Sequence, residues 1–194
     1  MPYLVPPVVP AGRLGETEQP VLEASGDLTL RPWLPADAND LVDAFGDPAI
    51  QRWHLRFLAS PEEARAWISK WSARWRAETD GGWAVSRSST GVLLGQVALR
   101  EVDLASGHAE CTYWVLPAAR GYGVASRSTA ELARWAFGVV GLHRLQLTHS
   151  VANEPSCRVA MRAGFTLEAT MRSQLLHADG WHDMHLHARV RGDP

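Results

Sequence analysis

A glycine-containing segment between a predicted strand and a predicted helix is the sharpest candidate for chemistry. It runs over residues 116–125 as Leu-Pro-Ala-Ala-Arg-Gly-Tyr-Gly-Val-Ala. Glycines let backbone N–H groups turn toward an anion, and the first turn of the following helix adds unpaired N–H donors and the positive end of its dipole. A phosphate or pyrophosphate therefore fits, although Gly-X-Gly before a helix is equally often only a tight turn. No Gly-Lys-Ser/Thr follows, and the preceding strands are predicted to be antiparallel, which argues against ATP and NAD.

Histidines and cysteines are the other candidates for chemistry. His182, His185 and His187 lie in one predicted strand, whose alternation puts only His185 and His187 on the same face. With no cysteine nearby in the sequence, we expect ordinary strand histidines and no bound metal. Cys157 is expected to be a buried thiol, since no adjacent histidine is predicted. Cys111 and Cys157 match no paired metal-ligand spacing and are too few for a disulfide scaffold, which favours a reducing, cytoplasmic compartment.

Composition limits the classes of protein to which the chain can belong. Its 194 residues are 46% hydrophobic and 21% charged, which suits one ordinary domain with a sizeable core. With 19 Lys+Arg against 21 Asp+Glu, the net charge of -2 gives no support for a nucleic-acid-binding surface. The sequence contains no run of about 18 apolar residues and no signal-peptide pattern, so neither a membrane span nor secretion by that route is expected.

The chain divides into an arm and a domain. Residues 1–26 are rich in Pro, Gly and Glu without periodicity, which predicts an arm that is disordered or docks on the domain or a partner. The domain is expected at 27–191, with a mixed α/β fold. Strands are predicted at 28–32, 83–85, 92–99, 109–116, 143–148 and 165–167, with a final hairpin at 172–176 and 182–190. Helices are predicted after 35–37, over 61–80, from 120 and over 153–163, whereas 52–58 is too irregular to assign.

Tryptophan is the one residue type in excess, with nine copies. Trp67, Trp71 and Trp75 recur at i, i+4 and i+8, so their rings share one face of the predicted helix over 61–80. Most simply, this face packs in the core or against another subunit. The alternative is an aromatic wall for a substrate.

In its context, the 116–125 segment resembles the acyl-CoA pyrophosphate loop of the GNAT superfamily of N-acetyltransferases, whose pattern Arg/Gln-X-X-Gly-X-Gly/Ala matches residues 120–125. A second block, residues 153–168, is similar to the Asn-X-X-Ser…Ala…Gly-Phe…Glu stretch of the RimJ/RimL-type branch, which modifies protein N-termini. Further agreement comes from Leu30-Arg31-Pro32, Gly95, Ala109-Glu110, Tyr113-Trp114-Val115 and Asp183. The resemblance covers about residues 27–191.

This resemblance implies a GNAT fold, in which a mixed, mostly antiparallel sheet of about six or seven strands is flanked by about four helices. The fourth and fifth strands of such a sheet splay apart. The pantetheine arm of acetyl-CoA would pair with the edge of the fourth strand at Trp114, Val115 and Leu116. The pyrophosphate would rest on the amides of Arg120, Gly121, Tyr122, Gly123, Val124 and Ala125. Asn153 would contact the pantetheine, and Ser156 would lie near the thioester sulfur.

Acetyl transfer needs an uncharged amine beside the thioester carbonyl, a donor for the oxyanion and a proton for the leaving thiolate. The resemblance makes Glu110 the candidate general base, acting directly or through water; the alternative is that it faces solvent or pairs with an arginine. Many GNAT members carry an acidic tyrosine where this chain has Ala160. The branch offers Ser156 as the acid instead, although a serine in the first turn of a helix is more often a cap.

The expected partners are acyl-CoA and an amine acceptor, with no metal. A protein α-amino group is favoured, because its pKa of about 7.7–8.0 is well below the 10.4 or so of lysine and it needs less help from a base. Trp33, Trp53 and His54 border the acceptor cleft in related folds and are candidate substrate-binding residues. The alternatives are a small-molecule amine acceptor (polyamine, amino acid or aminoglycoside), a non-catalytic acyl-CoA-binding module and an assembly partner. A homodimer is compatible with each of them.

Overall fold

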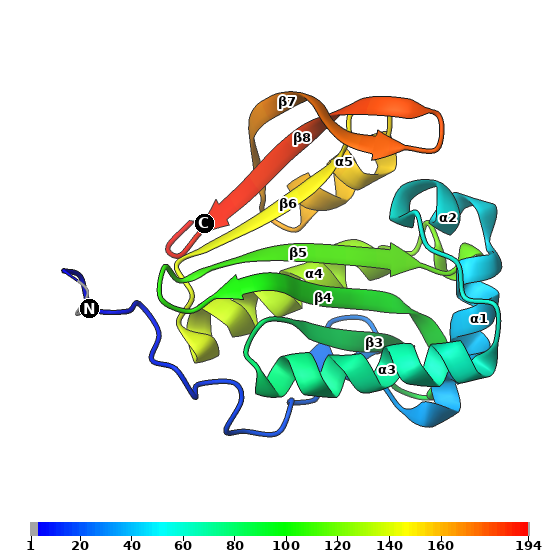
Figure 1. Cartoon of the computed structure of the whole chain (residues 1–194), viewed down its shortest axis with the longest axis horizontal. Helices are drawn as coiled ribbons and strands as arrows, with labels where there is room; N and C mark the ends of the chain where they lie inside the picture. Colours follow the sequence, from blue (N-terminus) through cyan, green and yellow to red (C-terminus); the bar gives the residue numbers. More distant parts are fainter. Residues whose placement is uncertain (1–3, 194) are drawn as a thin grey trace.

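The computed structural model describes residues 4–193, and within them a single eight-stranded sheet carries helices on both faces (Figure 1). The strands are β1 (Leu22–Ala24), β2 (Leu28–Pro32), β3 (Gly81–Arg87), β4 (Leu93–Asp103), β5 (His108–Val115), β6 (Arg144–Ser150), β7 (Thr166–His177) and β8 (Gly180–Val190). The α-helices are α1 (Ala38–Gly46), α2 (Pro48–His54), α3 (Pro61–Arg76), α4 (Val124–Trp135) and α5 (Glu154–Arg162). The sheet order is β1-β2-β3-β4-β5-β6-β8-β7. Within residues 4–193, β5 and β6 are the only neighbouring strands that pair in parallel. The predicted mixed, mostly antiparallel fold is confirmed.

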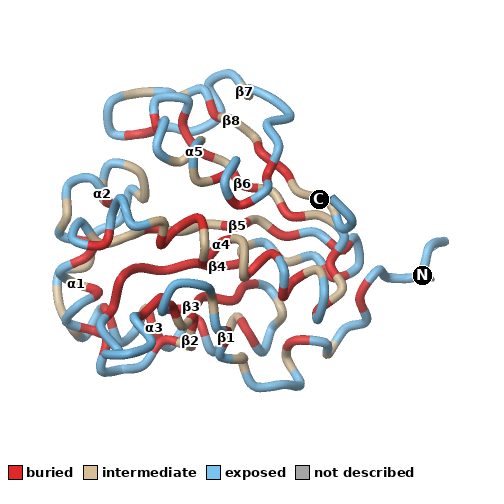
Figure 2. The backbone as a smooth tube through the Cα atoms, turned by 180° about the vertical axis from the view of Figure 1, so that it is seen from behind, coloured by how far each residue is buried: buried red, intermediate tan, exposed pale blue. Residues whose placement is uncertain are grey.

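Two hydrophobic clusters fill the two faces of the sheet. One lies under α4 and contains Trp83, Leu132 and Phe165; the other lies under α1 and α3 and contains Leu41 and Trp114. Residues of β5 alternate between these clusters, as the two-residue period of a strand requires. Figure 2 shows that β3 and β4 are buried along most of their length, whereas β5 alternates buried residues with partly exposed ones. The core therefore fixes β5, the strand on which the candidate base is predicted.

The sheet splits between β5 and β6. These strands pair only at His108–Arg144, Ala109–Leu145 and Glu110–Gln146, whereas β6 and β8 pair along seven successive positions. After Glu110 the edge of β5 is free of β6, and the two halves of the sheet diverge (Figure 1). This is the predicted splay of the fourth and fifth strands, which become β5 and β6 because an extra strand, β1, precedes them.

The segment before Asp27 docks on the domain, which is one of the alternatives that the sequence left open. Leu22–Ala24 extends the sheet as β1, and the side chains of Val9 and Leu14 are buried in the core. The Glu78 carboxylate accepts hydrogen bonds from three backbone N–H groups of residues 12–15, at 2.7, 2.7 and 3.0 Å. In Figure 1 this segment runs down the left side of the molecule and passes the C-terminal end of α3.

Three local predictions differ from the structure. Helix α2 lies in a stretch left unassigned; its signal was Asp47-Pro48, since Asp47 caps the helix through a bond from Ile50 N and Pro takes the first position. Helix α4 begins at Val124 rather than near residue 120, because the left-handed Gly121 and Gly123 precede it. Strands predicted separately at 165–167 and 172–176 form the single bulged strand β7.

Across residues 4–193, no helix combines the length and apolar character needed to cross a membrane.

Candidate active site

A cavity of about 740 Å³ opens where β5 and β6 part. Its wall is built from α2, β5, β6, the start of α4 and the start of α5. Ten of the residues predicted to bind acetyl-CoA or to take part in the transfer line it: Glu110, Trp114, Val115, Arg120, Gly121, Gly123, Val124, Ala125, Asn153 and Ser156. Two predicted cofactor residues lie elsewhere. The side chain of Leu116 packs against the cluster under α1 and α3, and Tyr122 is 74% exposed, away from the lining.

The loop before α4 has the geometry of an anion site. Gly121 and Gly123 have φ values of +83° and +71°, which a residue with a side chain adopts only with strain. A Cβ atom at Gly121 would meet nothing within 4 Å, and one at Gly123 would come no closer than 3.7 Å to Arg127 Nε. Within residues 4–193 no side chain caps the N-terminus of α4, so its first N–H groups remain available at the cavity.

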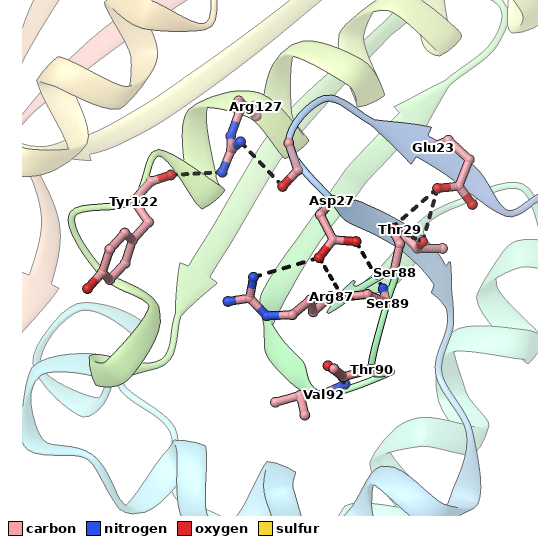
Figure 3. A network of polar contacts seen from close by, with 11 residues as sticks. Glu23, Asp27, Thr29, Arg87, Ser88, Ser89, Thr90, Val92, Tyr122 and Arg127 are labelled. Carbon is pink, nitrogen blue, oxygen red and sulfur yellow. Dashed lines mark hydrogen bonds and ion pairs between the residues drawn. The ribbon is translucent and has the colours of Figure 1, made fainter.

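Arg127 holds this loop in place from the first turns of α4. Its Nη2 donates to the carbonyl of Tyr122 at 2.8 Å (Figure 3). Its Nε donates to the carbonyl of Gly123 at 3.3 Å, and its Nη1 donates to the carbonyl of Gly26 at 3.4 Å. The same figure shows Asp27, in the turn between β1 and β2, bound to Ser89. The loop is thereby tied to the edge of the sheet on which the N-terminal segment docks.

Arg120 is tied to the opposite wall. Its Nη2 contacts Asp47 Oδ1 at 2.6 Å, and its Nε donates to the carbonyl of Val115 at 3.2 Å. Asp47 also caps α2, so one carboxylate connects the loop before α4 with the helix that carries Trp53 and His54. The guanidinium and the carboxylate are 41% and 19% exposed, and the pair is open to solvent screening.

The free edge of β5 presents backbone groups to the cavity. Leu116 N bonds back to Leu94 on the β4 side, whereas the carbonyls of Tyr113 and Val115 point the other way and accept from His54 Nε2 at 3.1 Å and from Arg120. Burial lowers the pKa of His54 to about 4, so its ring is neutral at physiological pH. An extended amide chain laid along this edge would find strand-type partners.

Glu110 sits at the vertex, where β5 and β6 make their last shared pair. Its Oε1 accepts a hydrogen bond from Thr148 Oγ1 on β6. Burial raises the pKa of Glu110 above its usual value; Thr148 opposes this shift, and the nearby Glu101 carboxylate adds to it. Arg100, its partner across β4 and β5, favours the charged form but does not outweigh the burial. Glu110 is thus a partly buried carboxylate that holds a proton more tightly than an exposed glutamate.

Comparison with known proteins identifies the family. The model of the acetyltransferase (GNAT) domain matches residues 27–166. The chain belongs to the GNAT acetyltransferase family. It is 24% identical to the uncharacterized N-acetyltransferase YoaA of Bacillus subtilis (strain 168) over 173 residues, which span 89% of this chain and 97% of YoaA.

Solved GNAT structures share the fold. RimL, a ribosomal L7/L12 alpha-N-protein acetyltransferase in complex with coenzyme A, superposes with a TM-score of 0.81 at 19% identity, covering 90% of this chain and all of RimL. Mycobacterium smegmatis RimJ, in complex with CoA-disulfide, superposes with a TM-score of 0.77 at 24% identity, covering 88% of this chain and 86% of RimJ. This chain is therefore a GNAT N-acetyltransferase with an α+β fold.

The start of α5 faces the GNAT cleft in this chain. Asn153 caps the helix, with its Oδ1 accepting from Ser156 N at 3.3 Å. Ser156 lines the cavity, and its carbonyl accepts from the Tyr113 hydroxyl at 3.5 Å. Burial raises the pKa of Tyr113 to about 12, so this phenol keeps its proton. Ala160, which stands at the tyrosine position of many GNAT members, is fully buried in the core.

One wall of the cavity in this GNAT domain is aromatic. Trp53 and His54 line the cavity as predicted, whereas Trp33 does not: it is 7% exposed and packs between Trp67 and Trp114. The side chain of Trp33 belongs to the cluster under α1 and α3, and its chain neighbours Pro32 and Leu34 are not among the residues that line the cavity. The tryptophan face of α3 supplies both core and wall, since Trp71 and Trp75 are buried while Trp67 and Trp71 line the cavity.

Sequence reasoning also missed a hydrogen-bonded chain beside the cavity. Ser150 Oγ, on the wall, contacts His182 Nδ1 at 2.7 Å, and His182 Nε2 contacts Asp179 Oδ1 at 2.8 Å. Both ring nitrogens of His182 are therefore occupied. The chain fastens the tip of the β7–β8 hairpin to the end of β6.

Proposed function

We propose that this acetyltransferase moves the acetyl group of acetyl-CoA to an N-terminal α-amino group of a protein. The observation that carries the proposal is the place of Glu110: a carboxylate with a raised pKa, held by Thr148, in the same cavity as the anion-binding loop and the open edge of β5. A base of this kind is matched to an amine whose own pKa is about 7.7–8.0.

The donor would lie across the cleft. Its pyrophosphate would be held by the N–H groups of the loop around Gly121 and Gly123 and of the first turn of α4. Its pantetheine amides would pair with the edge of β5 near Val115, and Asn153 would approach the same arm from α5. This arrangement would bring the thioester toward the vertex between the two strands.

The reaction would be direct attack within a ternary complex. The acceptor nitrogen forms a bond to the thioester carbonyl carbon, and Glu110 takes the proton from that nitrogen, directly or through water. Collapse of the tetrahedral intermediate breaks the carbon–sulfur bond. The Ser156 hydroxyl then donates a proton to the thiolate and takes one from solvent, and Glu110 returns its proton to solvent. The products are an amide and free coenzyme A. The bonds of Asn153 and Tyr113 to the first turn of α5 would position Ser156 for this step.

The charge of the wall favours a protein terminus over a polyamine as the acceptor. Five arginines and two carboxylates line the cavity: Arg56, Arg100, Arg120, Arg158 and Arg162, with Glu101 and Glu110. Arg100, Arg120 and Arg158 are paired with Asp80, Asp47 and Glu154, so the positive charge of the wall that these pairs leave is that of Arg56 and Arg162. A polycation would be repelled by such a wall, whereas a terminus followed by neutral or acidic residues would be attracted.

The test is release of coenzyme A from acetyl-CoA by the purified protein. The acceptors are N-terminal peptides with acidic, neutral or basic second and third residues, compared with spermidine, free amino acids and an aminoglycoside. We expect turnover with peptides, strongest for the acidic set, and mass spectrometry should place the acetyl group on the α-nitrogen. Turnover confined to a small-molecule amine, or acetylation of lysine side chains alone, would refute the proposal.

A further inference from the structure

A second group of side chains with its own chemistry lies beside the cavity. His149 on β6, Cys157 on α5, and His185 and His187 on β8 each offer one ligand atom, and these four atoms all lie within 4.8 Å of one another. The acetyl transfer proposed above uses none of the four. His149 lines the cavity wall, so the cluster adjoins the active site without belonging to its reacting groups.

Strand register brings the histidines together. His149 and His185 are direct partners across β6 and β8, and His187 lies two residues farther along the same face of β8. The His149 and His187 rings stack with centroids 5.1 Å apart, and the His149 and His185 rings meet edge to face at 5.4 Å. Cys157 comes from α5, one turn before the buried Ala160, and therefore lies on the helix face turned toward the sheet.

Nitrogen atoms of this cluster are buried without hydrogen-bond partners among residues 4–193. They are Nε2 of His149, Nδ1 of His185 and both ring nitrogens of His187. His149 and His187 are 5% and 0% exposed, and a backbone group of Phe165 approaches the His187 ring without reaching hydrogen-bond geometry. Buried polar atoms are normally paired, because desolvation without a partner costs stability in full. His182, on the same strand, has partners on both nitrogens.

We propose that His149, Cys157, His185 and His187 bind one divalent transition-metal ion of the zinc type. Three imidazoles and one thiolate supply the four ligands of a tetrahedral site, which suits Zn²⁺. Mg²⁺ and Ca²⁺ prefer oxygen ligands and are excluded. Bonds of about 2.0–2.1 Å to nitrogen and about 2.3 Å to sulfur hold the ligand atoms of a tetrahedral site about 3.3–3.6 Å apart, so the four atoms need to move together by about an ångström. Binding converts the Cys157 thiol to a thiolate and releases that proton to solvent.

The ion would join one helix and two strands on the β6–β8 side of the split between β5 and β6. It would tie α5 to β6 and β8, and the first turn of α5 carries Asn153 and Ser156. Its role is therefore to hold the cofactor-facing end of α5 against the sheet. All four protein ligands are supplied by this chain, so the ion has no open position for substrate and takes no part in the transfer itself.

The test uses the full-length protein, first freed of metal by a chelator and then titrated with Zn²⁺ against a competing chromophoric chelator. We expect one equivalent of Zn²⁺ per chain and a higher melting temperature with the metal bound. Titration with Co²⁺ should give the visible bands of a tetrahedral site together with a cobalt–thiolate charge-transfer band. Failure to bind one equivalent of either ion would overturn the proposal.

Variants separate a real site from adventitious binding. Cys157→Ser should abolish the charge-transfer band and weaken Zn²⁺ binding at least tenfold, and His185→Asn should weaken it similarly. Both positions are only half-buried, and circular dichroism of the metal-free variants checks that they fold. His182→Asn is the matched control and should bind Zn²⁺ as the parent protein does. Equal binding by all three variants, or equal loss from all three, would contradict the assignment.

Discussion

Replacing Glu110 by Gln removes the proposed base with little change of shape. Glutamine keeps an oxygen that can accept from Thr148, and neither the loop around Gly123 nor the edge of β5 is touched. We therefore expect the affinity for acetyl-CoA to be unchanged. The lost term is general base catalysis, which is typically worth about 10²–10⁴-fold.

The pKa of the acceptor amine decides where in that range the loss of rate falls. At pH 7 roughly one α-amine in seven is already neutral, against fewer than about one lysine amine in a thousand. Since an α-amine needs the base less, we expect kcat/KM for a peptide acceptor to fall about 10²-fold at pH 7, the low end of the range. At pH 9 nearly all α-amines are neutral, and the deficit should narrow to about tenfold or less.

The assay is coenzyme A release at saturating acetyl-CoA over pH 6–9.5. Glu101→Gln is the matched control, because Glu101 also lines the cavity and the substitution is the same. Removing its like charge lowers the pKa of Glu110, so this control should keep the plateau rate and move the acid limb to lower pH. A Glu110→Gln protein with unchanged kcat/KM, or with a deficit equal at every pH, would remove Glu110 from the role of base.

Three further outcomes follow from the geometry. Thr148→Val removes the hydrogen bond that lowers the pKa of the base, so the acid limb of the pH–rate profile should move to higher pH; an unmoved limb would mean that the bond does not hold the carboxylate. Gly123→Val should weaken acetyl-CoA binding at least tenfold by calorimetry. Its control is Gly91→Val, with a similar φ of +73° in a distant turn, which should lower the melting temperature as much as Gly123→Val does and leave acetyl-CoA binding intact. Equal acetyl-CoA affinities of the two variants would refute the loop assignment. Asp47→Asn keeps a cap on α2 but removes the ion pair with Arg120, so the affinity for acetyl-CoA should hold or rise. Arg120→Gln should lower that affinity several-fold. Losses of equal size in both variants would mean that acetyl-CoA binding requires the ion pair itself.

The residues that follow one another in sequence were the predictable part of this site. Glycine spacing over 120–125, with a strand before it and a helix after it, places the loop because every contribution is local. Glu110 and the block beginning at Asn153 followed from resemblance to a family, and the structure brings both to the same cavity. The splay between β5 and β6 required that resemblance as well, since no local pattern says where two strands stop pairing.

What the sequence could not supply are contacts made across elements. The expectation of ordinary histidines rested on spacing along one strand, where no cysteine is near His185 and His187. His149 and Cys157 reach them only through the register of β6 against β8 and the packing of α5. In the same way, periodicity could not tell whether Trp33, just after the end of β2, turns into the core or lines a cleft, because both cases give the same sequence pattern.

The docked N-terminal segment has a consequence for how the chain is made. Residues 8–20 are synthesised before the rest of the domain, and their partners follow much later. Glu78 binds residues 12–15, Trp75 and Trp83 donate to the carbonyls of Thr17 and Pro20, and Val8 N donates to the carbonyl of Ala105. These contacts span about 60 to 100 residues, so closing them carries a large loop entropy and they form only after the central strands exist. A nascent chain therefore keeps Leu14 and Leu22 uncovered through most of translation, and a polypeptide started at residue 27, where the family match begins, would never cover the core surface that these two side chains occupy.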